Sequence, residues 1–135
     1  MKRFTTQVLI FTSLMLMFFS LAAFLNHPQT EDKDYTTCLK KYTSAWGEFC
    51  VQCSDWHKSY RVNFRNTCTE TIDVKCGVQE VDKHWRTYTI LGLATNDTIS
   101  SYACEGTGKY MLWARKTGDR INEFPSDDDI NSTKK

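Results

Sequence analysis

The sequence lacks a strong net charge, and it lacks internal repeats and low-complexity segments. Its 135 residues include 17 lysines and arginines against 16 aspartates and glutamates. Beyond residue 25 the net charge is about −1, because only the basic residues Lys2 and Arg3 lie before that point. Nucleic-acid-binding domains usually carry a concentrated basic surface. The composition therefore excludes a nucleic-acid-binding protein of that kind.

The sequence also lacks the motifs of common nucleotide-binding and hydrolytic enzymes. The stretch "EGTGKYM" contains Gly108 and Lys109, but Ala103 stands where a phosphate-binding loop needs its first glycine. Tyr110 stands where that loop needs a serine or threonine for magnesium. No serine lies in a nucleophile-elbow context. We therefore expect the glycine-rich stretch to form a hairpin turn.

Candidate acid–base residues are present but carry little information. Asp55 and His57 are two residues apart and would face the same side of a strand, yet no activated nucleophile accompanies them. Glu48 with Asp55, or Glu70 with Asp73, could be drawn as a glycosidase pair, but 16 acidic residues offer such pairs by chance. We predict a non-enzyme without catalytic residues, cofactor or metal, and a small extracellular hydrolase is an alternative.

Residues 1–25 are predicted to be a targeting segment. Lys2 and Arg3 precede an uncharged stretch that is apolar from residue 8 to residue 25, as in a signal peptide with a cleavage site after Ala22. An apolar run of 18 residues is also near the lower limit for crossing a bilayer, so an uncleaved signal anchor is the alternative. In both cases the positive-inside rule sends the rest of the chain to the lumen or the exterior.

The cysteines all follow this segment, and in an exported chain an even number predicts disulfides, here three. The candidates are Cys38, Cys50, Cys53, Cys68, Cys76 and Cys104. Proximity favours a bridge from Cys38 to Cys50 or Cys53, with Cys68, Cys76 and Cys104 linking strands. A zinc site made of Cys50, Cys53, Cys68 and Cys76, or a redox dithiol at "CVQC", are the alternatives.

Two N-glycosylation sequons agree with export. They are Asn96-Asp97-Thr98, within the turn signal "LATNDT", and Asn131-Ser132-Thr133. We therefore predict glycans at Asn96 and Asn131.

The pattern of apolar residues predicts a mainly β fold. Spacing of three or four residues over 36–49 predicts a short amphipathic helix, with Leu39, Tyr42, Trp46 and Phe49 on one face. Period-two alternation and turn signals predict strands near 60–65, 72–78, 85–91, 99–104 and 110–115. The first two strands are separated by few residues, which favours an antiparallel hairpin. The expected fold is a small antiparallel β-sandwich or partly open barrel of about five strands after a helix, stapled by disulfides.

Four regions follow from these patterns. We expect a signal peptide or anchor at 1–25, a polar spacer at 26–35, a disulfide-rich β module at 36–118 and an acidic flexible tail at 119–135. A module of about 80 residues buries a marginal core, so disulfides would supply missing stability.

Two tryptophans are candidate ligand contacts. Trp56 and Trp85 have polar neighbours near predicted strand edges, whereas Trp46 and Trp113 fit core positions. Exposed aromatic rings could stack on sugars or anchor a protein partner. The alternative is that all four tryptophans fill the core.

A basic stripe is a second candidate contact. Arg61 and Arg65, with Lys75 on the neighbouring strand, would share the outer face of the predicted hairpin and could attract an anionic partner. The alternative is a solvated sheet face.

The stretches "CLKKYTSAWGEFCVQC", "RNTCTETIDVKCGVQE" and "SYACEGTGKYMLWARKTGD" resemble small exported cysteine-rich plant proteins of unassigned function. The resemblance covers roughly residues 38–119 and implies export and a disulfide-rich β module, but no ligand or catalytic residue. In size and strand content the chain is also similar to the plant self-incompatibility protein homologues, which are exported β-sandwiches.

We therefore predict a secreted, non-catalytic binding module for an extracellular glycan, a cell-wall component or a cell-surface protein. The same domain tethered as a single-pass membrane protein by residues 8–25 is an alternative.

Overall fold

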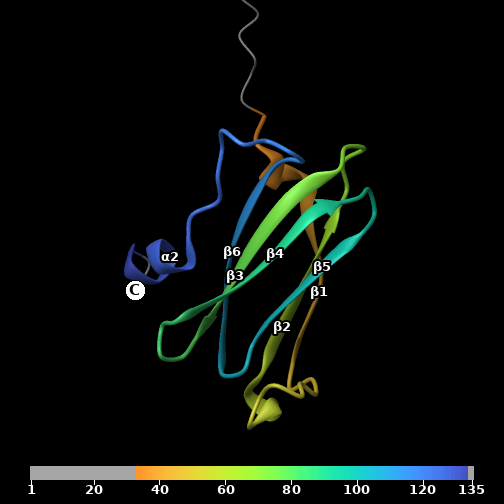
Figure 1. Ribbon diagram of the computed structural model, residues 1–135. Helices are drawn as coiled ribbons and strands as arrows, with labels where there is room; N and C mark the ends of the chain where they lie inside the picture. Colours follow the sequence, from red (N-terminus) through yellow and green to blue (C-terminus); the bar gives the residue numbers. More distant parts are fainter. Residues whose placement is uncertain (1–32, 134–135) are drawn as a thin grey trace, which may run out of the picture. The chain divides into compact units, whose positions relative to one another are not determined.

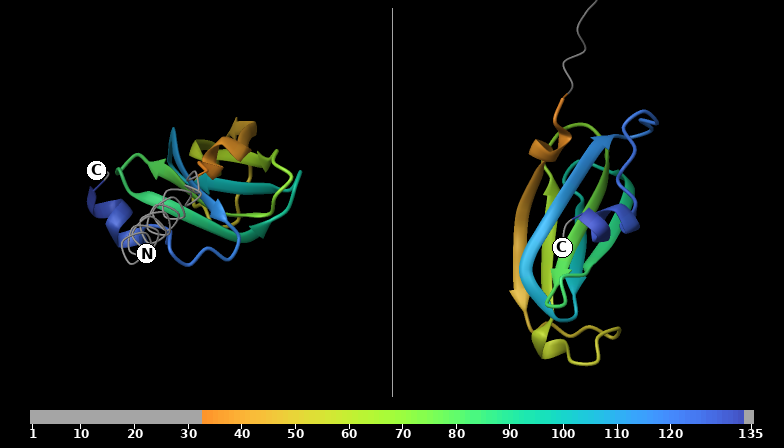
Figure 2. Two further views of the ribbon diagram at one scale, coloured as in Figure 1. Left: turned by 90° about the horizontal axis from the view of Figure 1, so that it is seen from above. Right: turned by 90° about the vertical axis from the view of Figure 1, so that its left-hand side faces the viewer.

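The computed structural model describes residues 33–133, which form two antiparallel three-stranded sheets packed face to face (Figure 1, Figure 2). One sheet has the order β1-β2-β5 and the other β4-β3-β6. The strands are β1 (Leu39–Trp46), β2 (Tyr60–Asn66), β3 (Ile72–Glu80), β4 (Trp85–Leu93), β5 (Thr98–Ala103) and β6 (Gly106–Lys116). The helices are η1 (Tyr35–Cys38), η2 (Trp56–Lys58) and α2 (Asp127–Thr133). The predicted class, a small antiparallel β-sandwich with disulfides, is confirmed, with six strands in place of five.

The core lies between the sheets and follows the predicted alternation. Val62 and Phe64 of β2 face inward, as do Ile72, Val74 and Val78 of β3, and all five are fully buried. In a strand successive side chains point to opposite faces, so these residues line the two inner surfaces of the sandwich. Truncation of Phe64 to alanine would cost about 3–5 kcal/mol.

The helix predicted for residues 36–49 is wrong, because this segment forms η1 and then strand β1. Of the apolar residues that suggested a helical face, Leu39 is buried but Tyr42, Trp46 and Phe49 are exposed. The register of β1 against β2 shifts between Lys41 and Thr43, so a bulge interrupts the two-residue period that marks a strand. Pairing with β2 therefore outweighs the local helical spacing.

The hairpin predicted between strands 60–65 and 72–78 is also wrong, because these strands are β2 and β3, which belong to different sheets. The buried side chain of Asn66 holds the segment in which the chain passes from one sheet to the other. Its Nδ2 donates to the carbonyls of Leu93 and Glu70, and its Oδ1 accepts from the amide of Cys68. The turn at Glu105 likewise carries the chain from β5 to the other sheet rather than closing a hairpin. The inward faces of β2 and β3 thus meet across the core.

Part of the predicted acidic tail (119–135) packs against the β4-β3-β6 sheet in the described residues. Lys75, whose side chain is 9% exposed, pairs with Asp127 Oδ1 at 2.6 Å and donates to the carbonyl of Pro125. Ile130 of α2 is buried, and the amide of Asn131 both accepts from and donates to the backbone of Trp85. That amide pairs with edge strand β4 much as a neighbouring strand would. The folded module therefore extends to residue 133.

The structure contains two disulfides where three were predicted. Cys38 pairs with Cys68, and Cys53 pairs with Cys104, so the expected bridge from Cys38 to Cys50 or Cys53 is wrong. Cys50 and Cys76 are unpaired and buried, and burial raises the pKa of Cys76 to about 11. Two of the four proposed zinc ligands are thus tied up in disulfides, and disulfides are compatible with an extracellular location.

The predicted signal segment (1–25) and most of the predicted spacer lie outside the described residues. Within residues 33–133 no helix has the length and apolar character needed to cross a membrane.

Candidate binding site at the loop end of the sandwich

Three chain connections meet at one end of the sandwich, which we call the loop end. They are the β1–β2 loop (47–59), the β3–β4 turn (81–84) and the β5–β6 turn (104–105) (Figure 1). The amide of Val81 donates to the carbonyl of Glu105 at 2.9 Å, and Lys58 Nζ lies 3.4 Å from Glu105 Oε1. Helix η1, drawn in orange, lies at the opposite end (Figure 1). The loop end is therefore a single surface built from three segments.

The β1–β2 loop is held by several local constraints. Cys53 is bonded to Cys104 at the end of β5, and Gly47 adopts a φ of 67° that favours glycine. The carboxylate of Asp55 caps η2 by accepting from the backbone amide of His57. The hydroxyl of Ser59 donates to the carbonyl of Glu48 across the base of the loop. A loop fixed in this way presents its side chains with little entropy left to lose on binding.

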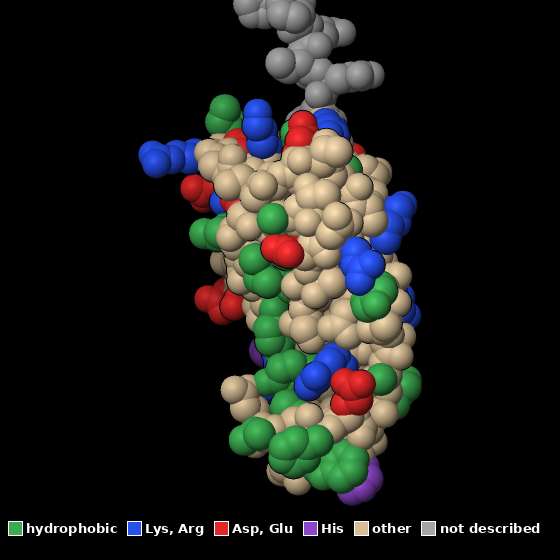
Figure 3. Space-filling view, turned by 90° about the vertical axis from the view of Figure 1, so that its right-hand side faces the viewer, with side chains coloured by type: hydrophobic (Ala, Val, Ile, Leu, Met, Phe, Trp, Pro, Cys, Tyr) green, Lys and Arg blue, Asp and Glu red, His purple; other side chains and the backbone are tan. Residues whose placement is uncertain are grey.

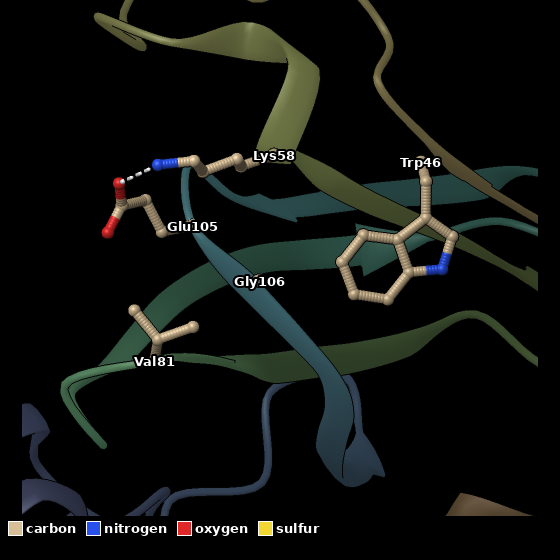
Figure 4. A pocket seen from close by; sticks show the side chains of 5 residues that line it. All are labelled: Trp46, Lys58, Val81, Glu105 and Gly106. Atoms are coloured by element: carbon tan, nitrogen blue, oxygen red, sulfur yellow. Dashed lines mark hydrogen bonds and ion pairs between the residues drawn. The ribbon is translucent and has the colours of Figure 1, made fainter.

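A pocket of about 500 Å³ opens at the loop end. Its lining residues are Trp46, Lys58, Val81, Glu105 and Gly106. Figure 4 shows the joined Lys58–Glu105 pair, Val81 and the Trp46 ring around the β6 backbone at Gly106. The lining thus combines an aromatic ring, an aliphatic side chain and one ion pair, a combination that suits an amphipathic ligand.

Trp46 is the most prominent residue of this pocket. Its side chain is 57% exposed, although it stands on a folded strand. The ring is supported by Tyr60, with ring centroids 4.8 Å apart, and a Cβ added at Gly108 would lie 3.3 Å from Trp46 Cζ2. Close packing against the backbone of Gly108 therefore holds the indole ring in place while part of it stays open to solvent.

The positive charge of Lys58 is offset by carboxylates of the loop end. Lys58 Nζ lies 3.4 Å from Glu105 and 3.7 Å from Asp55 Oδ2. The hydrogen bond from the backbone amide of His57 holds the pKa of Asp55 below its usual value. The pocket therefore offers one ammonium donor, Lys58, and one carboxylate acceptor, Glu105, without an excess of positive charge.

An apolar tip adjoins the pocket. Phe49 is 68% exposed, Val51 is 86% exposed, and Trp56 lies edge-on to Phe49 with ring centroids 6.3 Å apart. The His57 ring stacks on Trp56 with ring centroids 3.7 Å apart. In Figure 3 hydrophobic side chains gather at the lower end of the molecule beside a histidine. Such a contiguous exposed apolar patch is typical of an interaction surface.

The predicted aromatic contacts are placed differently by the structure. Trp56 lies at the loop end, but Trp85 is only 6% exposed on the outer face of the β4-β3-β6 sheet. There the rings of Trp85 and Trp113 flank Gly77, where a Cβ would lie 3.4 Å and 3.6 Å from them. Sequence reasoning assigned Trp46 to the core and so missed the exposed ring of the pocket. The only sequence signal was its position immediately before Gly47.

The predicted basic stripe is not formed as expected. Arg61 pairs with Glu48 at 3.3 Å, and the guanidinium of Arg65 lies over the ring of Tyr42 at 3.8 Å, both on the outer face of β2. Lys75 lies on the outer face of the opposite sheet, in its ion pair with Asp127. Because β2 and β3 do not pair, the three basic side chains do not share a face.

The candidate acid–base groups serve local structure. His57 Nδ1 lies 3.3 Å from Asp55 Oδ1, within the cap of η2. Asp73 is buried, accepts from the amide of Gly92 and pairs with Arg115 at 3.3 Å. Within residues 33–133 no cluster of three or more His, Cys, Asp or Glu side chains is arranged to hold a metal ion.

The two sequons differ in their surroundings. Asn96 is exposed in the β4–β5 turn with a φ of 69°. Asn131 instead uses its Nδ2 to donate to the carbonyls of Trp85 and Asp127. A glycan on Asn131 would compete with these bonds, so Asn96 is the sequon that the folded chain presents.

In comparisons with known proteins, no family model, no curated protein and no solved structure matches this chain.

Proposed function

We propose that the chain is an exported, non-catalytic binding module that holds an extracellular ligand at the loop end. The observation that carries the proposal is the ring of Trp46, exposed but supported on a folded strand at the mouth of a pocket of about 500 Å³. Large rigid aromatic side chains contribute much contact area to binding at little entropic cost. The apolar tip at Phe49 and Val51 widens the surface that a ligand could cover.

Export rests on two supports. The basic residues and apolar run of residues 1–25 have the pattern of a signal peptide, and the two disulfides are compatible with an extracellular location. The test is the intact mass of the protein recovered from the medium of a eukaryotic host after deglycosylation. A chain that begins near Ala23 supports secretion. A full-length chain found only in the membrane fraction favours the tethered alternative.

The binding proposal applies to the secreted and to the tethered form of the module. The chain enters the sandwich through η1, at the end opposite to the loop end (Figure 1). The proposed binding function does not depend on which form is correct.

The binding proposal is tested with protein that carries a fluorescent label after Lys135 and is applied to intact cells and isolated cell-wall material. We expect surface binding by the wild type and at least a tenfold loss in Trp46→Ala, because one anchoring ring at a binding site contributes about 2 kcal/mol. The matched control is Tyr42→Ala, which removes an exposed ring of the same strand on the outer sheet face. If Trp46→Ala binds as strongly as Tyr42→Ala and the wild type, the loop end is not the binding site.

A further inference from the structure

We propose that the ligand of the loop-end pocket is a neutral oligosaccharide whose pyranose ring stacks on Trp46. This inference rests on the proposed binding function and names the class of its ligand. A sugar ring has an apolar face of C–H groups and a rim of hydroxyls. A pocket for it needs a flat aromatic surface beside hydrogen-bonding groups. The loop end provides both within one group of residues.

The aromatic surface is the indole ring of Trp46. Tyr60 supports it with ring centroids 4.8 Å apart, and Gly108 lets the backbone of β6 approach Cζ2. A ring held on two sides is pre-organised, so little conformational entropy is lost when a ligand stacks on it. At 57% exposure, more than half of the residue's surface is accessible to a ligand.

The hydrogen-bonding groups are the ammonium of Lys58 and the carboxylate of Glu105, which lie 3.4 Å apart. Lysine only donates and an ionised carboxylate only accepts. A sugar hydroxyl does both, so neighbouring hydroxyls can accept from Lys58 and donate to Glu105 at the same time. Charge-assisted bonds of this kind are stronger than bonds between neutral groups.

The charge balance selects a neutral ligand over an anionic one. Lys58 lies 3.4 Å from Glu105 and 3.7 Å from Asp55, so its positive charge is already offset by two carboxylates. A uronic acid would bring a further carboxylate close to Glu105. Repulsion between the two negative charges would weaken the binding of such a sugar. The pocket therefore discriminates against pectin-like sugars.

The experiment is a titration of the ¹⁵N-labelled secreted protein followed by the indole N–H signals of its tryptophans. The probes are neutral hexasaccharides of β-1,4-linked glucose, xylose or mannose, with an oligogalacturonide as the anionic comparison. We expect at least one neutral probe, at millimolar concentration, to shift the Trp46 signal. The Trp85 signal is the internal control, because that ring is buried on the other sheet.

Variants separate the contacts. Trp46→Ala should weaken binding of the neutral probe at least tenfold, whereas Tyr42→Ala should leave it unchanged. Glu105→Gln keeps an acceptor and a similar shape, so it should bind better than Glu105→Leu, which keeps neither acceptor nor donor. Equal affinities of the two Glu105 variants would contradict the hydrogen-bonding role.

Failure of this inference is distinguishable from failure of the proposed function. If no neutral probe shifts Trp46, or if only the oligogalacturonide does, the neutral-sugar inference is overturned. In that case a loss of cell or wall binding in Trp46→Ala would still support the loop end as a binding site, with a protein or another ligand as its occupant. If that binding also survives Trp46→Ala, the proposed site itself is overturned.

Discussion

Breaking the Cys38–Cys68 disulfide should remove a large part of the stability of this module. The two cysteines are 30 residues apart in sequence, and the loop-closure relation for a crosslink of that span gives about 3.6 kcal/mol. A domain of this size has a free energy of unfolding of about 5–15 kcal/mol. The double variant Cys38→Ala/Cys68→Ala should therefore unfold at a temperature lower by about 15 °C, at about 4 °C per kcal/mol.

The measurement is thermal and urea unfolding followed by circular dichroism, with Cys50→Ala as the control. Cys50 is unpaired, so its substitution should cost less than about 1 kcal/mol. Mass spectrometry supplies the second readout: the oxidised chain should be four hydrogens lighter than the reduced one, since it holds two disulfides. Two thiols should react with an alkylating agent after denaturation without reduction.

Two results would refute this reasoning. One is a third disulfide that engages Cys50 or Cys76, which the structure leaves unpaired. The other is an unfolding temperature for Cys50→Ala as low as that of the double variant. Either result would mean that the pairing of the cysteines differs from the one described.

Three further predictions concern the rest of the module. Asp127→Asn should lower the free energy of unfolding by about 1–2 kcal/mol at pH 7, because it weakens the charge-assisted bond from Lys75 to a largely exposed carboxylate. The hydrogen bond from Lys75 holds the pKa of Asp127 below its usual 3.8. The stability difference between wild type and variant should therefore be present above pH 4 and vanish as the pH falls through the folded pKa, which acid titration of both proteins would show. Asn96→Gln should remove a glycosidase-sensitive mass from the secreted protein, and an unchanged mass, or one that disappears instead with Asn131→Gln, would contradict the assignment. Gly106→Ala should sharply reduce secretion, because a Cβ there would clash with the neighbouring tyrosine of β2, and secretion at the wild-type level would contradict the close approach of the two strands.

The outer face of the β4-β3-β6 sheet shows how the C-terminal segment contributes to this fold. Strand β3 is buried on both faces, although Asp73, Lys75 and Gln79 point away from the core. Asp73 pairs with Arg115, and Lys75 pairs with Asp127 from α2. The buried polar groups are thus satisfied by side chains from later in the chain, as buried charges require.

The sequence by itself determined the class of the fold and the inward residues of its central strands. The alternation of Val62 and Phe64, and of Val74 and Val78, predicts which side chains are buried, because the two-residue period of a strand is a local property of the backbone. The turn signal at Asn96 was also correctly located. These features depend on neighbours in the chain and can be derived without knowing the tertiary structure.

Tertiary structure alone decided how the strands are distributed between the sheets, which cysteines pair, and which tryptophan is exposed. A short connection is equally compatible with a hairpin and with a crossing between sheets, and here the buried amide of Asn66 and the Cys38–Cys68 disulfide accompany the crossing. The local sequence favours a buried Trp46 and an exposed Trp85, but the structure reverses this: Trp85 packs beside Gly77 and is buried, while Trp46 lies exposed where three connections meet. These outcomes rest on contacts between residues far apart in the chain, so no local pattern encodes them.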